Sequence, residues 1–207
     1  VILADDFASK LKELVSYDLS LERIGIFAPK ILDFEGKIDS AGLCLTFLRR
    51  FRDRGRGESG SGRYDSACRV FGASGACAVY NRNMLDSIRG PGGFFDEDFF
   101  IMLEDFDVSW RQARLGWHTL YSPVLNCKHK GGISHKKTGI GRAFMFRNRY
   151  FLLAKNESLP RLALLLLCSF FYDLPHAVFF ILTNPLASGF IRQTVCMLPA
   201  MIRKRKS

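Results

Sequence analysis

Six carboxylates fall within twelve residues of this chain, from Asp96 to Asp107, and aromatic side chains lie between them. Aromatic residues favour burial, whereas acids this close together repel one another unless a cation lies among them or they take part in proton transfer. Both demands restrict where this segment can lie in a fold. We therefore expect a binding or catalytic site here.

The size and charge of the chain indicate one core followed by a basic tail. A chain of 207 residues can bury one sizeable core and carry a small appendage. Residues 1–157 hold 24 basic and 19 acidic side chains, and residues 158–207 hold six and one, so each part contributes half of the net charge of +10. We expect residues 1–157 to form a domain and residues 158–207 a helical tail.

Apolar periodicity and turn residues predict alternating helices and strands, as in an α/β protein. The expected helices cover residues 4–17, 81–88, 105–115 and 143–155, and the expected strands cover 24–32, 38–45, 117–121 and 124–128. Gly116 is the expected stop of the third helix. In the fourth helix, we expect Phe151 and Leu152 to face inward and Arg147 to lie on an accessible face.

Two further segments allow more than one interpretation. The arginine-rich stretch from Arg49 to Arg63 could hold a diphosphate or an anionic acceptor, or it could be a solvated loop. Apart from Phe51 it lacks interleaved aromatics, so we do not expect nucleic-acid binding. The six cysteines show no metal-type spacing, which favours buried thiols in a cytosolic protein.

The tail is apolar and ends in a basic cluster. Residues 162–172 and 176–182 form two apolar runs divided by Asp173 and Pro175, and neither run is long enough alone to span a bilayer. Residues 203–206 are all basic. An apolar helical hairpin with such a cluster suits a membrane surface that bears anionic lipid. The alternative is a pair of core helices with a solvated end.

The acids Glu104, Asp105 and Asp107 begin a predicted helix, where the helix dipole favours negative charge. That effect explains one or two acids but not the further acids upstream, so an acid here is also a candidate general base. His129 ends a predicted strand. A lone histidine is usually not a ligand, and a divalent metal would need at least one more carboxylate beside it.

Several short motifs occur in a specific order between Val70 and Asn148. They are Val70-Phe-Gly-Ala-Ser-Gly-Ala, Gly93-Phe-Phe-Asp-Glu-Asp-Phe-Phe, Glu104-Asp-x-Asp, Trp110-Arg, Gly116-Trp, Tyr121-x-Pro, His129-x-Gly-Gly and Arg147-Asn. Their order and spacing closely resemble the family 2 glycosyltransferases. Within that family, the chain looks most like the rhamnosyltransferase-like enzymes that build bacterial surface polysaccharides.

The resemblance implies a GT-A fold, a mixed α/β sandwich of which this chain would be the C-terminal, acceptor-side half. It implies inverting sugar transfer from a nucleotide-sugar to a saccharide or lipid-linked saccharide, assisted by Mg²⁺ or Mn²⁺. It makes Asp105 the general base, Glu104 a residue that positions the acceptor or the base, and His129 a contact to metal and diphosphate. The implied substrate-binding residues are Gly72, Ala73, Ser74, Gly75, Asp107, Trp117 and Arg147.

In one respect the chain departs from this family. The family's nucleotide-binding strand and Asp-x-Asp metal motif would precede Val1, so we expect these 207 residues alone to be inactive. The resemblance also implies a cytoplasmic protein, peripheral on the inner face of the cell membrane. Two other functions stay open: a non-catalytic membrane-docking module and a metal-dependent hydrolase.

Overall fold

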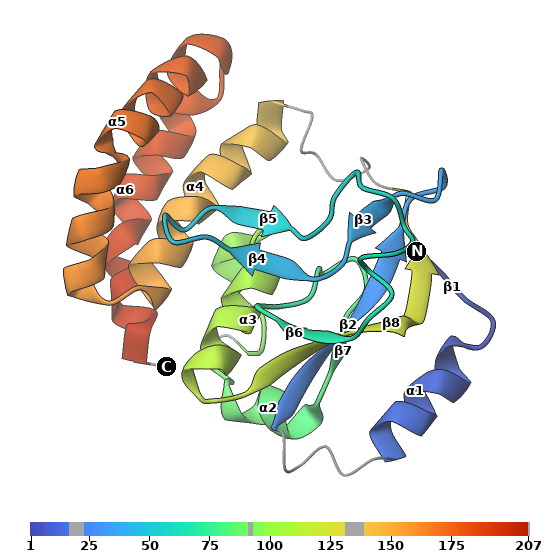
Figure 1. The fold of residues 1–207 in the computed structure, drawn as a ribbon. Helices are drawn as coiled ribbons and strands as arrows, with labels where there is room; N and C mark the ends of the chain where they lie inside the picture. The colour runs from blue at the N-terminus through green and yellow to red at the C-terminus, as the bar shows by residue number, and fades with distance from the viewer. Residues whose placement is uncertain (17–22, 91–92, 131–138, 207) are drawn as a thin grey trace. The chain divides into compact units, whose positions relative to one another are not determined.

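The computed structural model describes residues 1–16, 23–90, 93–130 and 139–206 (Figure 1). These residues belong to two compact units. Unit 1 consists of residues 1–89 and 108–131, and unit 2 of residues 90–107 and 132–207. The predicted division between residues 157 and 158 does not coincide with this one. The acidic segment belongs with the C-terminal helices because those helices pack around it.

Unit 1 is built on a six-stranded mixed sheet (Figure 1). Its strands are β1 (Ile2–Leu3), β2 (Ile24–Leu32), β3 (Ile38–Ser40), β6 (Cys68–Val70), β7 (Val79–Tyr80) and β8 (His118–Lys128). The central strands β2 and β8 run parallel, and every other pairing in this sheet is antiparallel. The predicted α/β class is thereby confirmed at the level of a mixed sheet with helices.

The segment after residue 117 forms one strand where we predicted two. Pro29 of β2 pairs with Ser122, but Lys30 pairs with Asn126, so three residues of β8 have no partner on β2. Pro123 lies among them, and a proline has no N–H to give to a sheet ladder. The break that the sequence indicated is thus a bulge within a continuous strand.

The predicted strand over residues 38–45 was wrong in its extent. It divides into β3 and β4 (Leu43–Leu45), and β4 pairs with β5 (Phe51–Asp53) in a separate two-stranded sheet. Gly42 lies at the division with φ +97°, where a Cβ would come within 2.8 Å of a Val70 methyl. A positive φ interrupts the extended backbone, so the chain leaves the first sheet there.

Helices cover both faces of the main sheet. Phe7, in α1 (Phe7–Ser16), packs with Ile24 and Phe27 on one face. On the other face, Ile26 packs with Met84, which lies in α2 (Arg82–Ser87). Neighbouring β2 residues therefore serve different cores, which is why this strand is apolar almost throughout.

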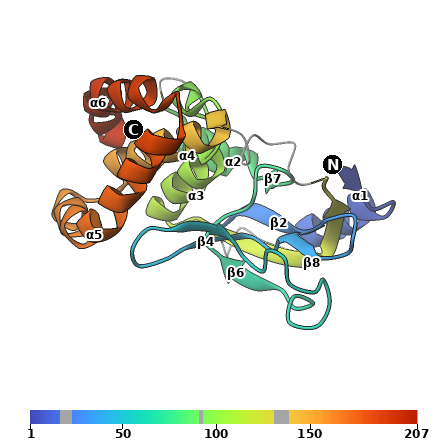
Figure 2. The same ribbon diagram turned by 90° about the horizontal axis from the view of Figure 1, so that it is seen from above.

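Unit 2 is helical. It contains the 3-10 helix η1 (Glu97–Phe99), the first residues of α3 (Glu104–Arg114), α4 (Gly139–Asn156), α5 (Leu159–Thr183), α6 (Ala187–Arg203) and the short η3 (Lys204–Lys206). Helices α4 and α6 pack side by side, with α5 beside them (Figure 2). The end of α3 is as predicted, because Gly116 adopts φ +76° two residues beyond it.

The two apolar runs of the tail form one helix, where we predicted a hairpin that turns between them. Helix α5 continues through Pro175, and the turn comes instead at residues 184–186. Pro175 removes one backbone hydrogen bond, and a 25-residue helix retains many others that hold it together. Within the described part of the chain, no helix combines the length and the apolar character needed to cross a membrane.

Candidate functional site

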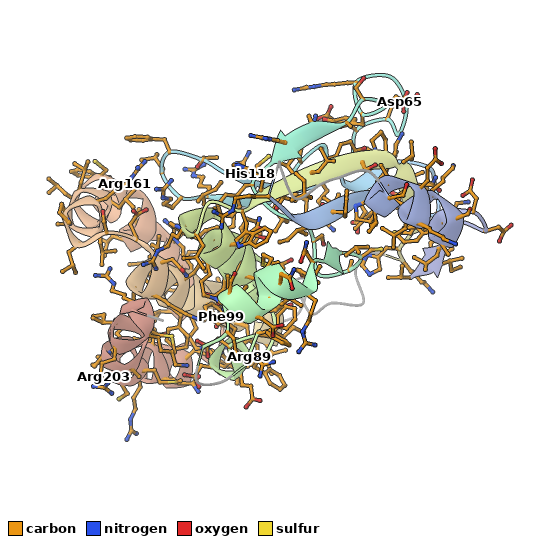
Figure 3. The ribbon with its side chains drawn as sticks, turned by 90° about the horizontal axis from the view of Figure 1, so that it is seen from below. Asp65, Arg89, Phe99, His118, Arg161 and Arg203 are labelled. Atoms are coloured by element: carbon orange, nitrogen blue, oxygen red, sulfur yellow. The ribbon has the colours of Figure 1, made fainter. Side chains whose placement is uncertain are left out.

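The acidic segment of unit 2 contains its own cations. Asp96 accepts hydrogen bonds from Lys155 (2.8 Å) and Lys204 (2.6 Å), and Lys204 also contacts Asp98 at 2.8 Å. Lys155 further donates to Asp107 at 2.9 Å. The two lysines come from the end of α4 and from η3, so the repulsion expected among these acids is relieved by distant parts of the chain. Figure 3 labels Phe99, the residue after Asp98.

These ion pairs shift the pKa values of Asp96 and Lys204. Burial opposes ionisation of Asp96, but hydrogen bonds from Lys155 and Lys204 outweigh it and hold the pKa of Asp96 below its ordinary value. Burial likewise disfavours the charge of Lys204, yet Asp96 and Asp98 raise its pKa overall. Both shifts favour the charged forms, so Asp96 and Lys204 form a structural ion pair.

Asp107 is part of the same structural network. Its side chain is almost fully buried, and its two oxygens accept hydrogen bonds from Lys155 and from Asn156, both at 2.9 Å. These contacts tie the first turn of α3 to the end of α4. Its predicted role in substrate binding is untested by these contacts.

Glu104 and Asp105 lie at the start of α3 and are half-buried. Asp105 accepts the backbone N–H of Phe106 at 2.8 Å through Oδ1. A carboxylate at a helix N-terminus is stabilised by the dipole and by the local N–H groups, and one oxygen held in this way fixes the orientation of the group. Asp105 is thus a half-buried, oriented carboxylate at the start of α3.

Arg147 is not accessible, contrary to what we predicted. It is 3% exposed and lies between the rings of Phe144 and Phe151. Its guanidinium donates to the backbone oxygens of Asp98 and Phe99 at 2.8 and 3.0 Å. Burial lowers its pKa from the ordinary value. The residue thus contacts backbone near the acids, and the structure places no anion-binding surface on it.

The glycine-rich segment of unit 1 is shaped by packing. A Cβ on Gly72 would lie 2.0 Å from Oγ of Ser109 in α3, so only glycine fits there. Ala73 is buried as well, whereas Ser74 is half-buried and Gly75 exposed. The first two of these predicted pocket residues therefore belong to the core of unit 1, and the last two reach its surface.

His129 follows β8, and its Nδ1 lies 2.8 Å from an oxygen of Asp39 on β3. The other Asp39 oxygen accepts a hydrogen bond from Arg56 at 2.8 Å. An Nδ1–H held by a carboxylate leaves Nε2 as the nitrogen that can accept a proton or bind a ligand. Asp39 was missed by sequence reasoning, because nothing in residues 38–40 points to a partner ninety residues away. Gly131 and Gly132, the rest of the His129 motif, lie outside the described residues.

The described residues do not complete a divalent-metal site. Among them, no three histidine, cysteine, aspartate or glutamate side chains gather as ligands would. His129 offers one nitrogen and its neighbour Asp39 is engaged by Arg56, which falls short of the oxygen-rich shell that Mg²⁺ or Mn²⁺ prefers. We therefore assign no catalytic step to the predicted metal ion.

Trp117 and two loop arginines have partners within unit 1. The indole N–H of Trp117 donates to Ser87 at 3.1 Å, and Arg23 lies 5.1 Å from the ring centre. Arg54 stacks on Tyr64 at 4.9 Å, while Arg56 holds Asp39. These contacts order part of the arginine-rich stretch, and its proposed anion binding remains a prediction. Figure 3 labels His118, directly after Trp117.

Comparison with known proteins relates part of the chain to a sugar-transferring enzyme. Over 91 residues, it is 30% identical to N-acetylglucosaminyl-diphospho-decaprenol L-rhamnosyltransferase from two strains of Mycobacterium tuberculosis. The match covers 41% of this chain and only 27% of those relatives. No family model and no solved structure matches the chain. The similarity supports sugar transfer in general.

Proposed function

We propose that this chain carries the acceptor-side part of an inverting glycosyltransferase of GT-A type. The mixed sheet, the order of the sequence motifs and the similarity to a rhamnosyltransferase all support this proposal. The donor would be a nucleotide-activated sugar, with rhamnose as the first candidate. The name of the relative suggests an acceptor in which a saccharide is linked through diphosphate to a polyprenyl chain.

Asp105 is the general base in this proposal. A sugar hydroxyl is a poor nucleophile, so its proton must pass to a base as its oxygen attacks the anomeric carbon. The new carbon–oxygen bond forms while the bond to the nucleotide diphosphate breaks, and the leaving diphosphate takes the electron pair. The carboxylate of Asp105 receives the proton, and Glu104 helps to position the acceptor.

The observation that carries this assignment is the contrast among the acids. Asp96 and Asp107 are buried and bound to lysines, which suits them to hold the fold. Asp105 is half-buried at the helix start, and the bond from the Phe106 N–H orients it. A base needs both a fixed orientation and access to the acceptor.

His129 would contact the donor diphosphate through Nε2, with Asp39 fixing the tautomer of the ring. We assign no step to Mg²⁺ or Mn²⁺. Their requirement is a separate proposal, and loss of transfer on chelation with recovery on adding either ion would support it.

We further propose that unit 2 docks on a membrane surface that bears anionic lipid. Exposed apolar side chains recur along α5 every three or four residues: Leu164, Leu167, Phe171, Leu174, Val178 and Ile181. The segment from residue 158 carries six basic and one acidic residue. Lys204 and Arg205 bond within unit 2, but Arg192 and Arg203 are exposed, and Figure 3 labels Arg161 and Arg203. Apolar area with positive charge suits an interface that contains anionic headgroups.

The decisive experiment compares Asp105→Asn with the unchanged sequence in the complete natural protein. We expect the substitution to abolish sugar transfer to a lipid-linked saccharide while binding of the nucleotide-sugar stays within about twofold, since a loss confined to the transition state lowers kcat. Asp86→Asn is the matched control, because Asp86 is exposed and pairs with Arg82 and Arg89. It should transfer sugar at the normal rate.

Other outcomes would favour the other functions. Retained transfer by Asp105→Asn would move the base elsewhere. Release of the sugar to water with no use of acceptor, dependent on a metal, would favour a hydrolase. Vesicle binding without any turnover in the complete protein would favour a docking module.

A further inference from the structure

The backbone that leads into α3 has an unusual conformation. Phe100, Met102 and Leu103 have φ of +59°, +71° and +68°, all in the left-handed region. Each such non-glycine residue costs roughly 1–2 kcal/mol relative to ordinary backbone. All three lie among the four residues that directly precede Glu104 and Asp105. We call residues 100–103 the strained segment.

Burial accounts for only part of what holds the strained segment. Met102 and Leu103 are buried, so packing stabilises their positions. Phe100 is 79% exposed, and its ring centre lies 5.3 Å from that of Phe144. Its conformation is therefore not explained by burial of its own side chain.

Asn148 of α4 binds the carbonyls of this region. Its side-chain amide nitrogen donates to the backbone oxygens of Phe99, Ile101 and Met102, at 2.8, 2.7 and 2.7 Å. Two amide hydrogens are thus shared among three acceptors, all on the chain that turns into α3. One side chain of α4 therefore contacts three carbonyls of the turn that leads into α3.

Arg147 orients Asn148 and extends the same contacts. Its Nε donates to the side-chain oxygen of Asn148 at 2.9 Å, which turns the amide nitrogen toward the strained segment. Its Nη2 donates to the carbonyls of Asp98 and Phe99. Its Nη1 donates to the side-chain oxygen of Gln193 at 2.9 Å. A buried guanidinium is costly unless its hydrogens are used, and here two backbone carbonyls and two side-chain amides accept them.

Helix α4 also holds the other side of the acid pair. Lys155 and Asn156 bind both oxygens of Asp107, two residues after Asp105. Asn148 and Lys155 are seven residues apart, which places them on one face of α4. This face of α4 therefore contacts residues on both sides of Glu104 and Asp105 in the sequence.

We propose that Arg147 and Asn148 are positioning residues: by binding the carbonyls of residues 98–102, they hold the strained segment and so fix where Glu104 and Asp105 are presented. This inference rests on the proposed function. It replaces substrate binding by Arg147 with an indirect role through the backbone.

The test is Asn148→Ala in the complete natural protein, assayed for transfer from a nucleotide-sugar to a lipid-linked saccharide. We expect kcat per folded molecule to fall about 10- to 100-fold, because a small displacement of a catalytic group can cost that much. KM for the nucleotide-sugar should stay within about twofold, as expected when ground-state binding is intact. Asn148→Gln, which keeps an amide donor, should recover part of the rate.

Asn184→Ala is the matched control. Asn184 is also buried in unit 2, and its amide donates to the carbonyl of Gly139 at 2.7 Å. Its loss should lower stability but leave kcat per folded molecule unchanged. If Asn148→Ala does not fold, Arg147→Lys serves instead, since it keeps the charge and removes the bond that orients Asn148.

The outcomes separate this inference from the proposed function. Normal kcat in folded Asn148→Ala, or equal losses in Asn148→Ala and Asn184→Ala, would overturn the positioning role. If Asp105→Asn is inactive in the same assay while Asn148→Ala keeps its rate, only the positioning role fails. If Asp105→Asn remains active, the base assignment itself fails and the positioning role fails with it.

Discussion

At the level of single residues, the neighbouring acids of residues 96–107 differ in their burial and in the contacts that hold them. Asp96, Asp98 and Asp107 are bound to lysines from α4 and η3. Glu104 and Asp105 lie between them in sequence, at the start of α3. The first group stabilises unit 2, and Glu104 and Asp105 are the acids to which we assign the proposed chemistry.

Asp96→Asn should destabilise unit 2 by about 3 kcal/mol at neutral pH, the low end for breaking a buried ion pair. The side chains of Asp96 and Lys155 are only 8% and 5% exposed. Urea unfolding followed by circular dichroism measures the difference. Asp6→Asn, whose exposed pair with Lys10 is worth little, is the control.

The stability lost in Asp96→Asn should also depend on pH. The pKa of Asp96 is below its ordinary value of 3.8 in the folded protein, so the unfolded chain binds its proton first as pH falls. Its stabilising contribution is complete above that value and disappears as the pH drops through the lower folded pKa. The stability difference between the two proteins should therefore shrink in strong acid. A difference that is constant with pH would contradict this assignment.

At the level of elements, α5 is the helix whose sequence fits its structure least well. Pro175 lies inside it and Pro160 lies in its first turn. The first turn of a helix accepts proline because its N–H groups have no partner within the helix, whereas the interior loses a hydrogen bond. The two prolines therefore provide a matched pair.

Pro175→Ala should stabilise α5 by about 2 kcal/mol, which is the helix penalty of roughly 3 less about 1 for the added freedom of the unfolded chain. Helix content and the midpoint of thermal unfolding, both from circular dichroism, should rise. Pro160→Ala should give no such gain. Equal effects from the two substitutions would show that Pro175 is not inside a regular helix.

At the level of the whole molecule, net charge and exposed apolar surface concern the surroundings of the protein. The chain carries +10, and α5 exposes large apolar side chains such as Phe171, at 84%. Contiguous exposed apolar area usually marks an interface. This surface is the basis for the proposed membrane docking.

Vesicles of phosphatidylglycerol should bind the protein more tightly than vesicles of phosphatidylcholine, and added salt should weaken the difference because it screens charge. Leu167→Glu combined with Phe171→Glu should reduce binding in a flotation assay by about tenfold or more, since each buried apolar side chain is worth about 1.5–3 kcal/mol. Val15→Glu on α1, at an exposed apolar site in unit 1, should bind normally. Undiminished binding by the double variant would remove α5 from the interface.

Local features of the fold were predictable from the sequence. Periodicity located helices α2 and α3 and strand β2 to within a residue or two, and Gly116 marked the end of α3. The sequence also drew attention to residues 96–107, because closely spaced acids repel one another while the aromatic residues between them favour burial. Such features depend on backbone propensity and on neighbouring side chains, which a sequence displays directly.

The long-range partners of the charged residues followed from the packing of the elements and could not be predicted. Lys155 and Lys204 meet Asp96 across 59 and 108 residues, and His129 meets Asp39 across 90. Helical periodicity placed Arg147 on an accessible face, but the carbonyls of residues 98 and 99 draw it into the interior. Contacts between distant residues depend on how elements pack, and a buried charge goes wherever packing supplies its hydrogen-bond partners.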